Sequence, residues 1–377
     1  MNESDLHTAL QAVTQAAAAD AVRVDRDAAF PDATLTAARQ HGLLGLVSHP
    51  SVGGAGLGLA EASRVIEALA GACGSSAMVL TMHYAAVAVL EATGNEALRR
   101  SIAAVEHLST LAFSERGSRS HFWAPLGKPA VQGSTATLSS SKSFVTSARH
   151  ASSYVWSSLP LGESGLSSLW LVPRNLPGVS VGPAFDGLGL RGNDSSVVEM
   201  TGATLARSSL LGADGKGFDL MMGSVLPWFS VLSASCSLGL AAAAYAATTA
   251  HVSATRLEHV QSSLAELPTI RAQVARMNLT LTQARLLVAD AITAIMTKRA
   301  DALLRILQTK AAAAECALSV TDAAMRACGG AAFRRDFGLE RAFRDARAAS
   351  VMGPTTDVLY DFIGKHQCGL DLFGGAS

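Results

Sequence analysis

The sequence has no excess of charge of either sign and few charged residues of any kind. Lys plus Arg and Asp plus Glu each number 30, and charged residues make up 16% of the 377 positions. A protein that binds DNA or RNA needs a basic surface to meet the phosphates, and no basic run stands out along this chain. The composition therefore argues against a nucleic-acid partner.

Cysteine is scarce and scattered. No two cysteines form a Cys-x-x-Cys pair, and no Cys/His cluster has zinc-site spacing, so we expect no metal site. An odd number of widely spaced cysteines favours reduced thiols, and the first residues lack the apolar core of a signal peptide. We therefore expect a cytoplasmic protein. The five cysteines are Cys73, Cys236, Cys316, Cys328 and Cys368.

Charge is absent altogether from 220–250, a stretch long enough to cross a bilayer. Pro227, several hydroxyl residues and a run of alanines make it only weakly hydrophobic, and no basic cluster flanks it. A helix that is apolar on all sides also suits the centre of a helical bundle. We therefore expect a buried helix and no membrane span. The 49% hydrophobic content with zero net charge further favours a homo-oligomer, which would bury apolar surface.

Three stretches of different character follow one another. Alanine-rich segments with apolar residues at helical spacing occupy 1–110. Short alternating runs separated by turn residues fill 111–211 and predict an antiparallel β domain. The helical period returns over 212–377 and predicts a four-helix bundle. Because the element types are segregated, we expect an α+β fold of three domains. The glycine-rich stretch 53–56 follows no strand, so we reject a Rossmann motif.

The segment after the glycine pair Gly329-Gly330 has a distinctive spacing. It reads Gly-Gly-x-x-Phe-x-x-Asp-x-x-x-Glu-Arg-x-x-Arg-Asp-Ala and closely resembles the C-terminal signature of the acyl-CoA dehydrogenase family of flavoproteins. The resemblance implies an FAD cofactor and a helical, β, helical chain order. It also implies a homotetramer or dimer that oxidises the CH–CH group of an acyl-CoA or acyl-carrier thioester. The charged pair Glu340 and Arg344 lies at helical spacing, which favours a structural role over catalysis.

Two motifs in the β stretch resemble flavin-binding segments of that family. The run that ends at Ser114 and Glu115, with Ser120 beyond it, is similar to a loop that touches the flavin pyrimidine and the pyrophosphate. Arg116 and Arg119 depart from the family pattern there. The run Lys142-Ser143-Phe144-Val145-Thr146 resembles a segment whose aromatic ring lies against the isoalloxazine. The resemblance assigns Ser114, Ser120, Phe144 and Thr146 to the cofactor, and a buried Phe in an ordinary strand is the alternative for Phe144.

Further cofactor contacts are implied near the C-terminus. Arg256 stands near the position of a family arginine that reaches the FAD pyrophosphate, and a planar guanidinium suits phosphate. Gly329 and Gly330 resemble backbone that contacts the adenosine half of an FAD held by a neighbouring subunit. Thr355 falls in the segment that approaches the flavin. The predicted FAD site thus draws on more than one chain.

The position of the family's catalytic glutamate is occupied by Gly353. That carboxylate removes the acidic α proton of the thioester in related enzymes, and proton abstraction needs such a group close to the carbon. Some members place the base on an earlier helix, where this chain has Phe229 and Ser230. Asp357 is one helical turn beyond Gly353 and is our candidate base. A carboxylate at a helix N-terminus is the alternative reading of Asp357.

Three functions remain open. The first is dehydrogenation of an acyl thioester, with an electron acceptor that the sequence does not identify, or oxidation of a substrate that needs no strong base. The second is a flavin-dependent monooxygenase of the same fold, which uses reduced flavin and O₂ with a flavin reductase as partner. His83, His121 and His259 would then be acid/base candidates, although a lone histidine is more often structural. The third is a flavin-binding homologue without catalysis.

Overall fold

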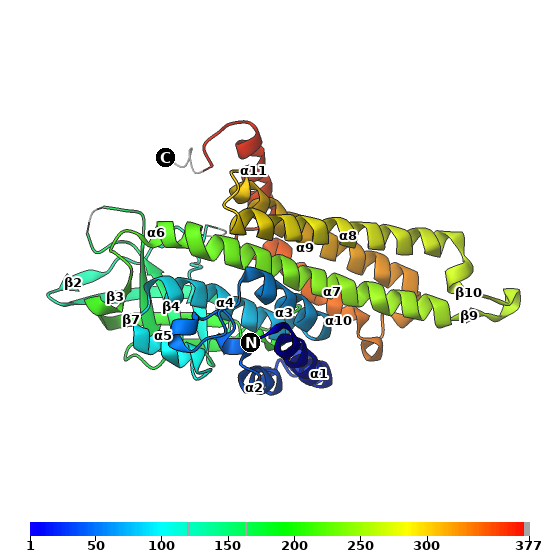
Figure 1. The fold of residues 1–377 in the computed structure, drawn as a ribbon, viewed down its shortest axis with the longest axis horizontal. Coiled ribbons are helices and arrows are strands. Elements are labelled where there is room, and N and C mark those ends of the chain that lie inside the picture. Colours follow the sequence, from blue (N-terminus) through cyan, green and yellow to red (C-terminus); the bar gives the residue numbers. More distant parts are fainter. Residues whose placement is uncertain (119–120, 163, 373–377) are drawn as a thin grey trace.

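The computed structural model describes residues 1–118, 121–162 and 164–372. Helices come first, two β sheets follow, and long helices complete the chain (Figure 1). This order confirms the predicted α+β fold class. The first helical part is covered by five α-helices: α1 (Glu3–Arg26), α2 (Asp32–Gln40), α3 (Leu59–Ala72), α4 (Gly74–Thr93) and α5 (Glu96–Ala103).

Helix α1 illustrates how the sequence sets these elements. The Asn2 side chain accepts a hydrogen bond from the Asp5 amide, and the Asp5 side chain accepts one from the Asn2 amide, which satisfies two of the amides left free at the helix start. Buried residues then recur every three or four positions, so one face of the helix packs inward. These are Leu6, Ala9, Val13, Ala17, Ala21 and Val24.

The β part consists of two four-stranded sheets, ordered β1-β4-β5-β8 and β2-β3-β7-β6. The prediction of purely antiparallel pairing is wrong for one pair, because β1 runs parallel to β4. A parallel pair needs a long crossover, which the loops and strands between β1 and β4 supply. The strands are β1 (Ser109–Ala112), β2 (Ala130–Gln132), β3 (Thr135–Val145), β4 (Ser153–Ser158), β5 (Ser168–Pro173), β6 (Val179–Ala184), β7 (Ser196–Ala206) and β8 (Leu210–Leu211).

The last part is a helical bundle with one short hairpin. The bundle contains α6 (Gly217–Leu220), α7 (Leu226–Ala254), α8 (Pro268–Met296), α9 (Ala302–Cys328), α10 (Leu339–Val351) and α11 (Thr356–Gln367). A π-helical turn, Met221–Val225, joins α6 to α7 just before Pro227, whose ring cannot follow a regular helical turn. The hairpin β9 (Arg256–Leu257) and β10 (Ser262–Ser263) was not predicted, because such short strands show no hydrophobic period.

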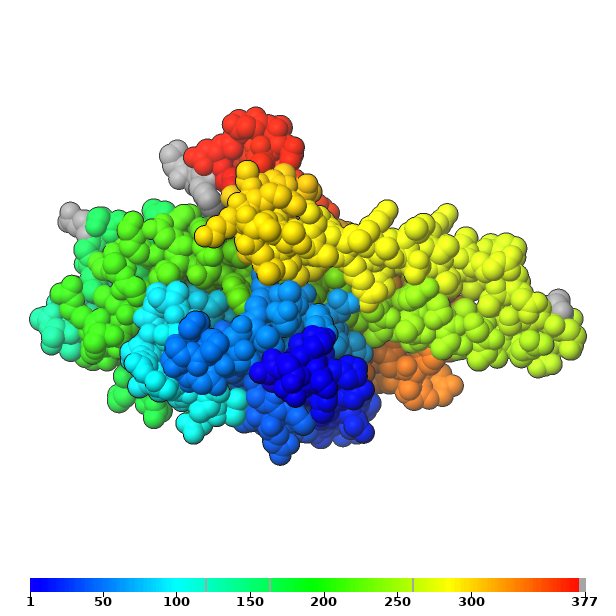
Figure 2. Space-filling view, in the orientation of Figure 1, coloured from blue at the N-terminus to red at the C-terminus, as the bar shows by residue number. Residues whose placement is uncertain are grey.

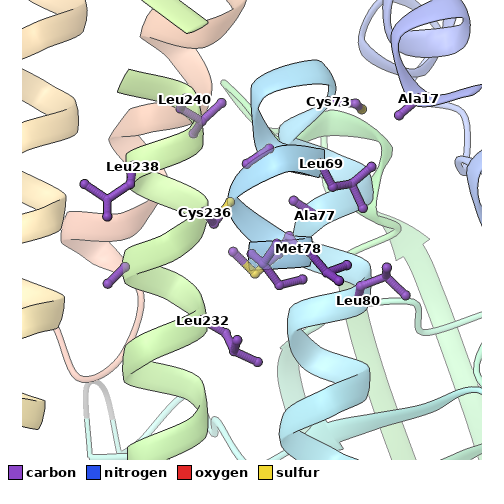
Figure 3. Close-up of a cluster of buried hydrophobic side chains, with 14 of the residues drawn as sticks. Ala17, Leu69, Cys73, Ala77, Met78, Leu80, Leu232, Cys236, Leu238 and Leu240 are labelled. Atoms are coloured by element: carbon purple, nitrogen blue, oxygen red, sulfur yellow. The ribbon is translucent and has the colours of Figure 1, made fainter. Parts of the chain in front are cut away.

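Helix α7 lies at the centre and packs against α3, α4, α8 and α9 (Figure 1). Its Leu232 and Cys236 meet Met78 of α4 in the core shown in Figure 3. A Cβ on Gly239 would lie 2.2 Å from the carbonyl oxygen of Glu67, so only glycine allows α3 to approach α7 this closely. The uncharged stretch of the sequence is therefore an interior helix.

Three helical segments are long and apolar enough to cross a membrane by length and composition alone, within the described part of the chain. The most apolar window of Gly217–Ala254 is 89% buried within the protein, and that of Gly74–Thr93 is 72% buried. Helix α8 differs, since only 28% of its window is buried and Leu279, Leu286 and Met296 are exposed. It runs along the outer surface in Figure 2. Helix α8 therefore presents several large apolar side chains on the surface of the chain.

The acidic and basic residues of the signature helix α10 join the three parts of the chain. The Arg344 guanidinium donates to both carboxylate oxygens of Asp25 at 2.8 and 2.6 Å, to the Leu188 carbonyl at 3.0 Å, and to Glu340. Asp345 accepts a 2.6 Å hydrogen bond from the Leu190 amide. These contacts tie α1, the turn before β7 and the bundle together, so the structural interpretation of Glu340 and Arg344 agrees with the contacts.

Replacing Asp345 with asparagine will change how stability depends on pH. Burial raises the pKa of Asp345 to about 6 from 3.8, so the folded state binds the proton more tightly than the unfolded state does. The stability that the protonated side chain contributes is therefore present below pH 3.8 and is lost as the pH rises through 6. The side chain introduced by Asp345→Asn keeps an oxygen for the Leu190 amide and does not titrate. From pH 4 to 7 the unfolding free energy of the variant should therefore gain about 2–3 kcal/mol relative to the unaltered protein, as measured by urea unfolding. A difference that stays constant over this range would contradict the assignment.

Candidate functional site

Two of the predicted cofactor-binding segments meet at one corner of the β part. The Ser143 amide donates to the Ser114 carbonyl at 2.8 Å, which places the end of β1 beside the end of β3. The Lys142 ammonium donates to the Phe113 carbonyl at 3.3 Å from the same strand. The structure thus brings Ser114 next to the segment that carries Phe144 and Thr146. Ser120 lies outside the described residues.

A buried ion pair holds this corner together. The Lys142 ammonium lies 2.5 Å from Glu115 Oε1 and donates to Ser157 Oγ at 2.8 Å, while the Leu126 amide donates to Glu115 Oε2 at 3.2 Å. Lys142 is fully buried, and burial lowers its pKa to about 8, against the opposing effect of Glu115. Both residues were part of the recognised motifs, but no spacing rule pairs them. Their contact is a product of the fold.

Phe144 is a large aromatic residue whose side chain is exposed on the surface of the chain. Its side chain is 69% exposed, and its backbone has a φ of 55°, a left-handed conformation that is costly for a residue with a side chain. The ring contacts only its neighbour Phe185 among the ring pairs of the described residues, with centroids 4.6 Å apart. Phe144 is therefore held outward in a strained conformation, which the alternative of a buried Phe in a strand does not explain.

The residues around Phe144 fit a flavin. Thr146 is buried with 5% exposure, and among the described residues the Ser147 Oγ beside it has no hydrogen-bond partner. A flat apolar ring with polar edges would cover Phe144 and offer hydrogen-bond partners to hydroxyl groups of this kind. The corner can accordingly hold a flavin through Ser114, Phe144 and Thr146.

The turn between α10 and α11 contains the position of the missing glutamate. Gly353 lies in this turn, and Thr355 is the N-cap residue of α11. Phe229 of α7 approaches the same place, because the Lys310 ammonium lies 5.9 Å from its ring centroid and contacts the turn as well. Two positions at which the family resemblance led us to expect a base therefore lie close together here, and neither Gly353 nor Phe229 can accept a proton.

Lys310, on α9, is the residue that sequence reasoning missed. Its ammonium donates to the carbonyls of Ala349, Met352 and Pro354 at 3.2, 3.0 and 2.8 Å. The side chain is 1% exposed, and burial lowers its pKa to about 7. The signal in the sequence is a lysine followed by four alanines, and a lysine is rarely buried unless its protons have partners.

Asp357 lies on the outer side of α11. It is exposed, whereas the buried residues of this helix are Thr356, Leu359 and Phe362. It also lies in the first helical turn, where a carboxylate interacts favourably with the helix dipole. The burial pattern thus favours the structural alternative, and the role of Asp357 as base stays a prediction.

The remaining predicted cofactor contacts lie elsewhere in the chain. Arg256 is exposed in the β9–β10 hairpin, at the opposite end of the long axis from the β sheets (Figure 1). Gly329 and Gly330 form a 3₁₀ turn after α9 and are exposed. One chain does not bring Arg256 to Phe144. A cofactor that touches both residues would have to lie between two chains.

The three histidines proposed for oxygen chemistry differ in environment. His83 is fully buried, its Nε2 bonds the Leu44 carbonyl at 2.9 Å, and its Nδ1 accepts from the Ser109 amide at 3.1 Å. Burial lowers its pKa to about 4, so the imidazole is neutral at pH 7, and both of its ring nitrogens already have hydrogen-bond partners. His83 is therefore structural. His121 packs edge-on against Trp123 with centroids 5.1 Å apart, and His259 is exposed.

Aromatic residues form an apolar wall between the β part and the bundle. Phe122 lies 6.3 Å from Phe113 and 5.1 Å from Trp123, and Trp123 lies 5.6 Å from Phe362 of α11, all between ring centroids. Phe229 belongs to the same buried cluster. The start of α7 and the buried face of α11 are thus packed in apolar surroundings.

Helices, two sheets and a helical bundle follow one another in this order, with an exposed aromatic residue, Phe144, at a corner of the β part. Models of the acyl-CoA dehydrogenase N-terminal and C-terminal domains match residues 3–104 and 215–367, which together are more than half of the chain. The chain belongs to the acyl-CoA dehydrogenase family. Its members are flavin-dependent oxidoreductases, so the predictions of an FAD-type cofactor and of an enzyme of this class are confirmed.

Individual relatives agree with this assignment. The chain is 26% identical over 340 residues to the mitochondrial isobutyryl-CoA dehydrogenase of Dictyostelium discoideum, covering 87% of this chain and 80% of that protein. Butyryl-CoA dehydrogenase from Megasphaera elsdenii superposes with a TM-score of 0.89 at 19% identity, covering 98% and 99% of the two chains. FMN-bound TdsC from Paenibacillus sp. A11-2 superposes with a TM-score of 0.86 at 20% identity, covering 96% and 98%. The two structural likenesses concern the fold alone.

Proposed function

We propose that this protein is a flavin-dependent oxidoreductase that acts on the CH–CH group of an acyl thioester, carried by CoA or by a carrier protein. The observation that supports this most is the corner formed by Ser114, Phe144 and Thr146, next to the buried Lys142–Glu115 pair. The isobutyryl-CoA and butyryl-CoA dehydrogenases named above act on acyl-CoA thioesters. The apolar wall formed by Phe122, Trp123 and Phe362 suits an acyl chain.

We assign the following roles in cofactor binding and proton removal to residues of this chain. When bound, the flavin supplies the hydride acceptor. Phe144 and Thr146 would hold the flavin, Phe144 through its exposed ring and Thr146 through its hydroxyl, and the Lys142–Glu115 pair holds the two segments that carry them together. Removal of the α proton needs an acceptor near the α10–α11 turn. Asp357, in the first turn of α11, remains the proposed base.

One observation favours a second candidate, a flavin-dependent monooxygenase of the same fold. Gly353 and Phe229 both lack a proton acceptor, and a reaction of reduced flavin with O₂ does not require one over the α carbon. Of the histidines proposed for oxygen chemistry, His121 is exposed and His83 is buried, while His259 lies in the β9–β10 hairpin, away from the two four-stranded sheets. A protein that keeps the fold and the flavin without catalysis is the third candidate.

Anaerobic titration separates these candidates. Under nitrogen, an acyl-CoA panel should bleach the yellow flavin absorption if the protein is a dehydrogenase. Bleaching only by a flavin reductase with NAD(P)H, followed by a transient absorption band when air is admitted, would instead establish the monooxygenase. A flavin that stays bound but is bleached by neither route would leave only the non-catalytic, flavin-binding candidate, whereas a protein that takes up neither FAD nor FMN would contradict all three.

The substitution Asp357→Asn tests whether the Asp357 carboxylate is the base. If the Asp357 carboxylate takes the α proton, the Asp357→Asn variant should reduce its flavin about 10²–10⁴-fold more slowly with acyl-CoA, since general bases contribute rate factors of this size. The measurement is stopped-flow absorbance under nitrogen, with flavin content as the control for folding. An unchanged rate removes Asp357 from the mechanism.

We also propose a cytoplasmic homo-oligomer, as a tetramer or a dimer, in which each cofactor is bound by two chains. The separation of Arg256 from Phe144 within one chain supports shared cofactor sites, and the exposed apolar residues of α8 support a partner chain. The five unpaired cysteines suit a reducing compartment. Sedimentation velocity of the flavin-loaded protein will measure the number of chains.

A further inference from the structure

The α10–α11 turn is organised around a single buried cation. The Lys310 ammonium reaches it from α9 and contacts three of its carbonyl oxygens, those of Ala349, Met352 and Pro354, at 3.2, 3.0 and 2.8 Å. An ammonium group has three protons. All three are therefore used, and Lys310 has no proton left to give to a substrate.

The three carbonyls lie in the last turn of α10 and in the segment just beyond it. Helix α10 ends at Val351 and α11 begins at Thr356, so the carbonyls of Ala349 and Met352 have no complete helical turn after them to supply amide donors. Pro354 has no amide, and it is buried. Without Lys310 these carbonyls would face an apolar interior near Phe229, at a cost of about 1–3 kcal/mol for each unpaired group.

We propose that Lys310 is a positioning residue that fixes the α10–α11 turn, and with it the backbone at Gly353, against Phe229 of α7. The lysine acts from α9 through the backbone of the turn and not on the substrate. This inference rests on the proposed function only for the statement that the turn borders the substrate.

The geometry explains why a charged side chain is kept in an apolar site. Burial alone lowers the pKa of Lys310, whereas three carbonyl dipoles directed at one nitrogen favour its charged form. A charged hydrogen bond is about twice as strong as a neutral one, so a single ammonium can hold three acceptors where a neutral side chain could not. The turn is thereby held at three points along its length.

Hydrogen exchange measured by mass spectrometry tests the proposal without any assay of activity. In Lys310→Met, which has a similar shape but no donor, protection of the peptide that covers 348–358 should fall at least 10-fold. The Met352 amide, which donates to the Ala348 carbonyl at 3.0 Å, is a direct reporter. Peptides from α8 should keep their protection. A folded Lys310→Met protein whose turn stays fully protected would overturn the proposal.

Thr309→Val is the matched control. Thr309 precedes Lys310 on the same helix and is equally buried, but its hydroxyl faces α8, where it donates to the Leu287 carbonyl at 3.4 Å. This variant loosens α9 on its other side and should leave the turn protected. Equal loss of protection at the turn in both variants would reduce Lys310 to a general contributor to stability and overturn the proposal.

Chemical rescue provides a second line of evidence. Lys310→Ala lacks the three carbons and the nitrogen that propylammonium supplies, so millimolar propylammonium should restore protection of the turn, while n-propanol should not. Equal rescue by propanol would show that volume rather than charge is what matters, and would overturn the proposal. If neither Lys310→Met nor Lys310→Ala folds, hydrogen exchange in the unaltered protein tests the proposal instead. The turn should then be protected as strongly as α9, and rapid exchange of the turn contradicts the proposal.

A third readout separates this inference from the proposed function. In a protein that also carries Gly353→Glu, Lys310→Met should lower kcat for acyl-CoA with little change in KM, because the base is misplaced and binding is not. If exchange at the turn responds as expected but no acyl-CoA is oxidised by any variant, the proposed function fails and the positioning role stands.

Discussion

Introducing glutamate at position 353 will increase the rate at which saturated acyl-CoA bleaches the flavin by about 10²–10⁴-fold, the contribution expected of one well-placed general base. The position lies in the α10–α11 turn opposite Phe229, where the aromatic residues of the apolar wall supply no carboxylate. The carbonyls on either side of Gly353, those of Met352 and Pro354, are bonded to Lys310 at 3.0 and 2.8 Å. The new side chain would therefore start from a fixed backbone, and the nearby ammonium would keep it ionised.

Stopped-flow absorbance under nitrogen, with a series of acyl chain lengths, measures this gain. Gly353→Gln is the matched control, because glutamine has nearly the same size but accepts no proton. The control should stay at the rate of the unaltered protein. Equal rates for the glutamate and glutamine variants would show that acyl thioesters do not reach the turn with their α carbon exposed to it. The monooxygenase would then become the better candidate.

Lys142→Met will cost about 3–5 kcal/mol of folding stability, the usual result of leaving one member of a buried ion pair without its partner. The Glu115 side chain is 7% exposed and would keep the Leu126 amide as its donor. The change also removes the bonds to the Phe113 carbonyl and Ser157, which join β3 to β1 and β4. Flavin content after purification should fall with the stability, because Phe144 and Thr146 follow Lys142 within four residues at the end of β3.

Urea unfolding and the visible flavin spectrum measure the two effects. Lys216→Met is the matched control, since Lys216 forms an ion pair with Asp219 in which both side chains are about two thirds exposed. Loss of this exposed ion pair should change the free energy of unfolding by less than about 0.5 kcal/mol. The double variant Lys142→Met with Glu115→Gln removes both charges and should recover part of the loss. If the single and double variants are equally unstable, the charge of Glu115 is not the cause.

Much of the α+β architecture was predictable because it depends on local periodicity. The alternation of apolar residues places β4 and β5, and the uncharged, alanine-rich stretch corresponds to α7, since only an interior position tolerates a helix that is apolar all round. The parallel pairing of β1 with β4 was not predicted. Strand partners far apart in the sequence are chosen by packing, and a strand carries no mark of the direction of its neighbour.

The candidate site, like the fold, was only partly predictable from the sequence. Motifs identified Ser114, Phe144 and Thr146, and the structure brings them to one corner, but their roles toward the cofactor stay predictions until a flavin is seen against them. The motif with Arg344 and Asp345 was recognisable as a signature, whereas its contacts with Asp25 and Leu190 depend on residues more than 150 positions away. Asp357 was chosen for its helical spacing, which does not reveal which side of α11 faces the interior.

By itself, the order of residues determined the family, the succession of helix and strand, and the loss of a carboxylate at position 353, because each of these depends on residue types at fixed spacing. Only the tertiary structure decided that Lys142 meets Glu115, that Phe144 is held outward, and that Lys310 supports the turn at Gly353. The two lysine contacts join segments far apart in the sequence, because a buried ammonium group is costly unless the fold supplies it with hydrogen-bond acceptors.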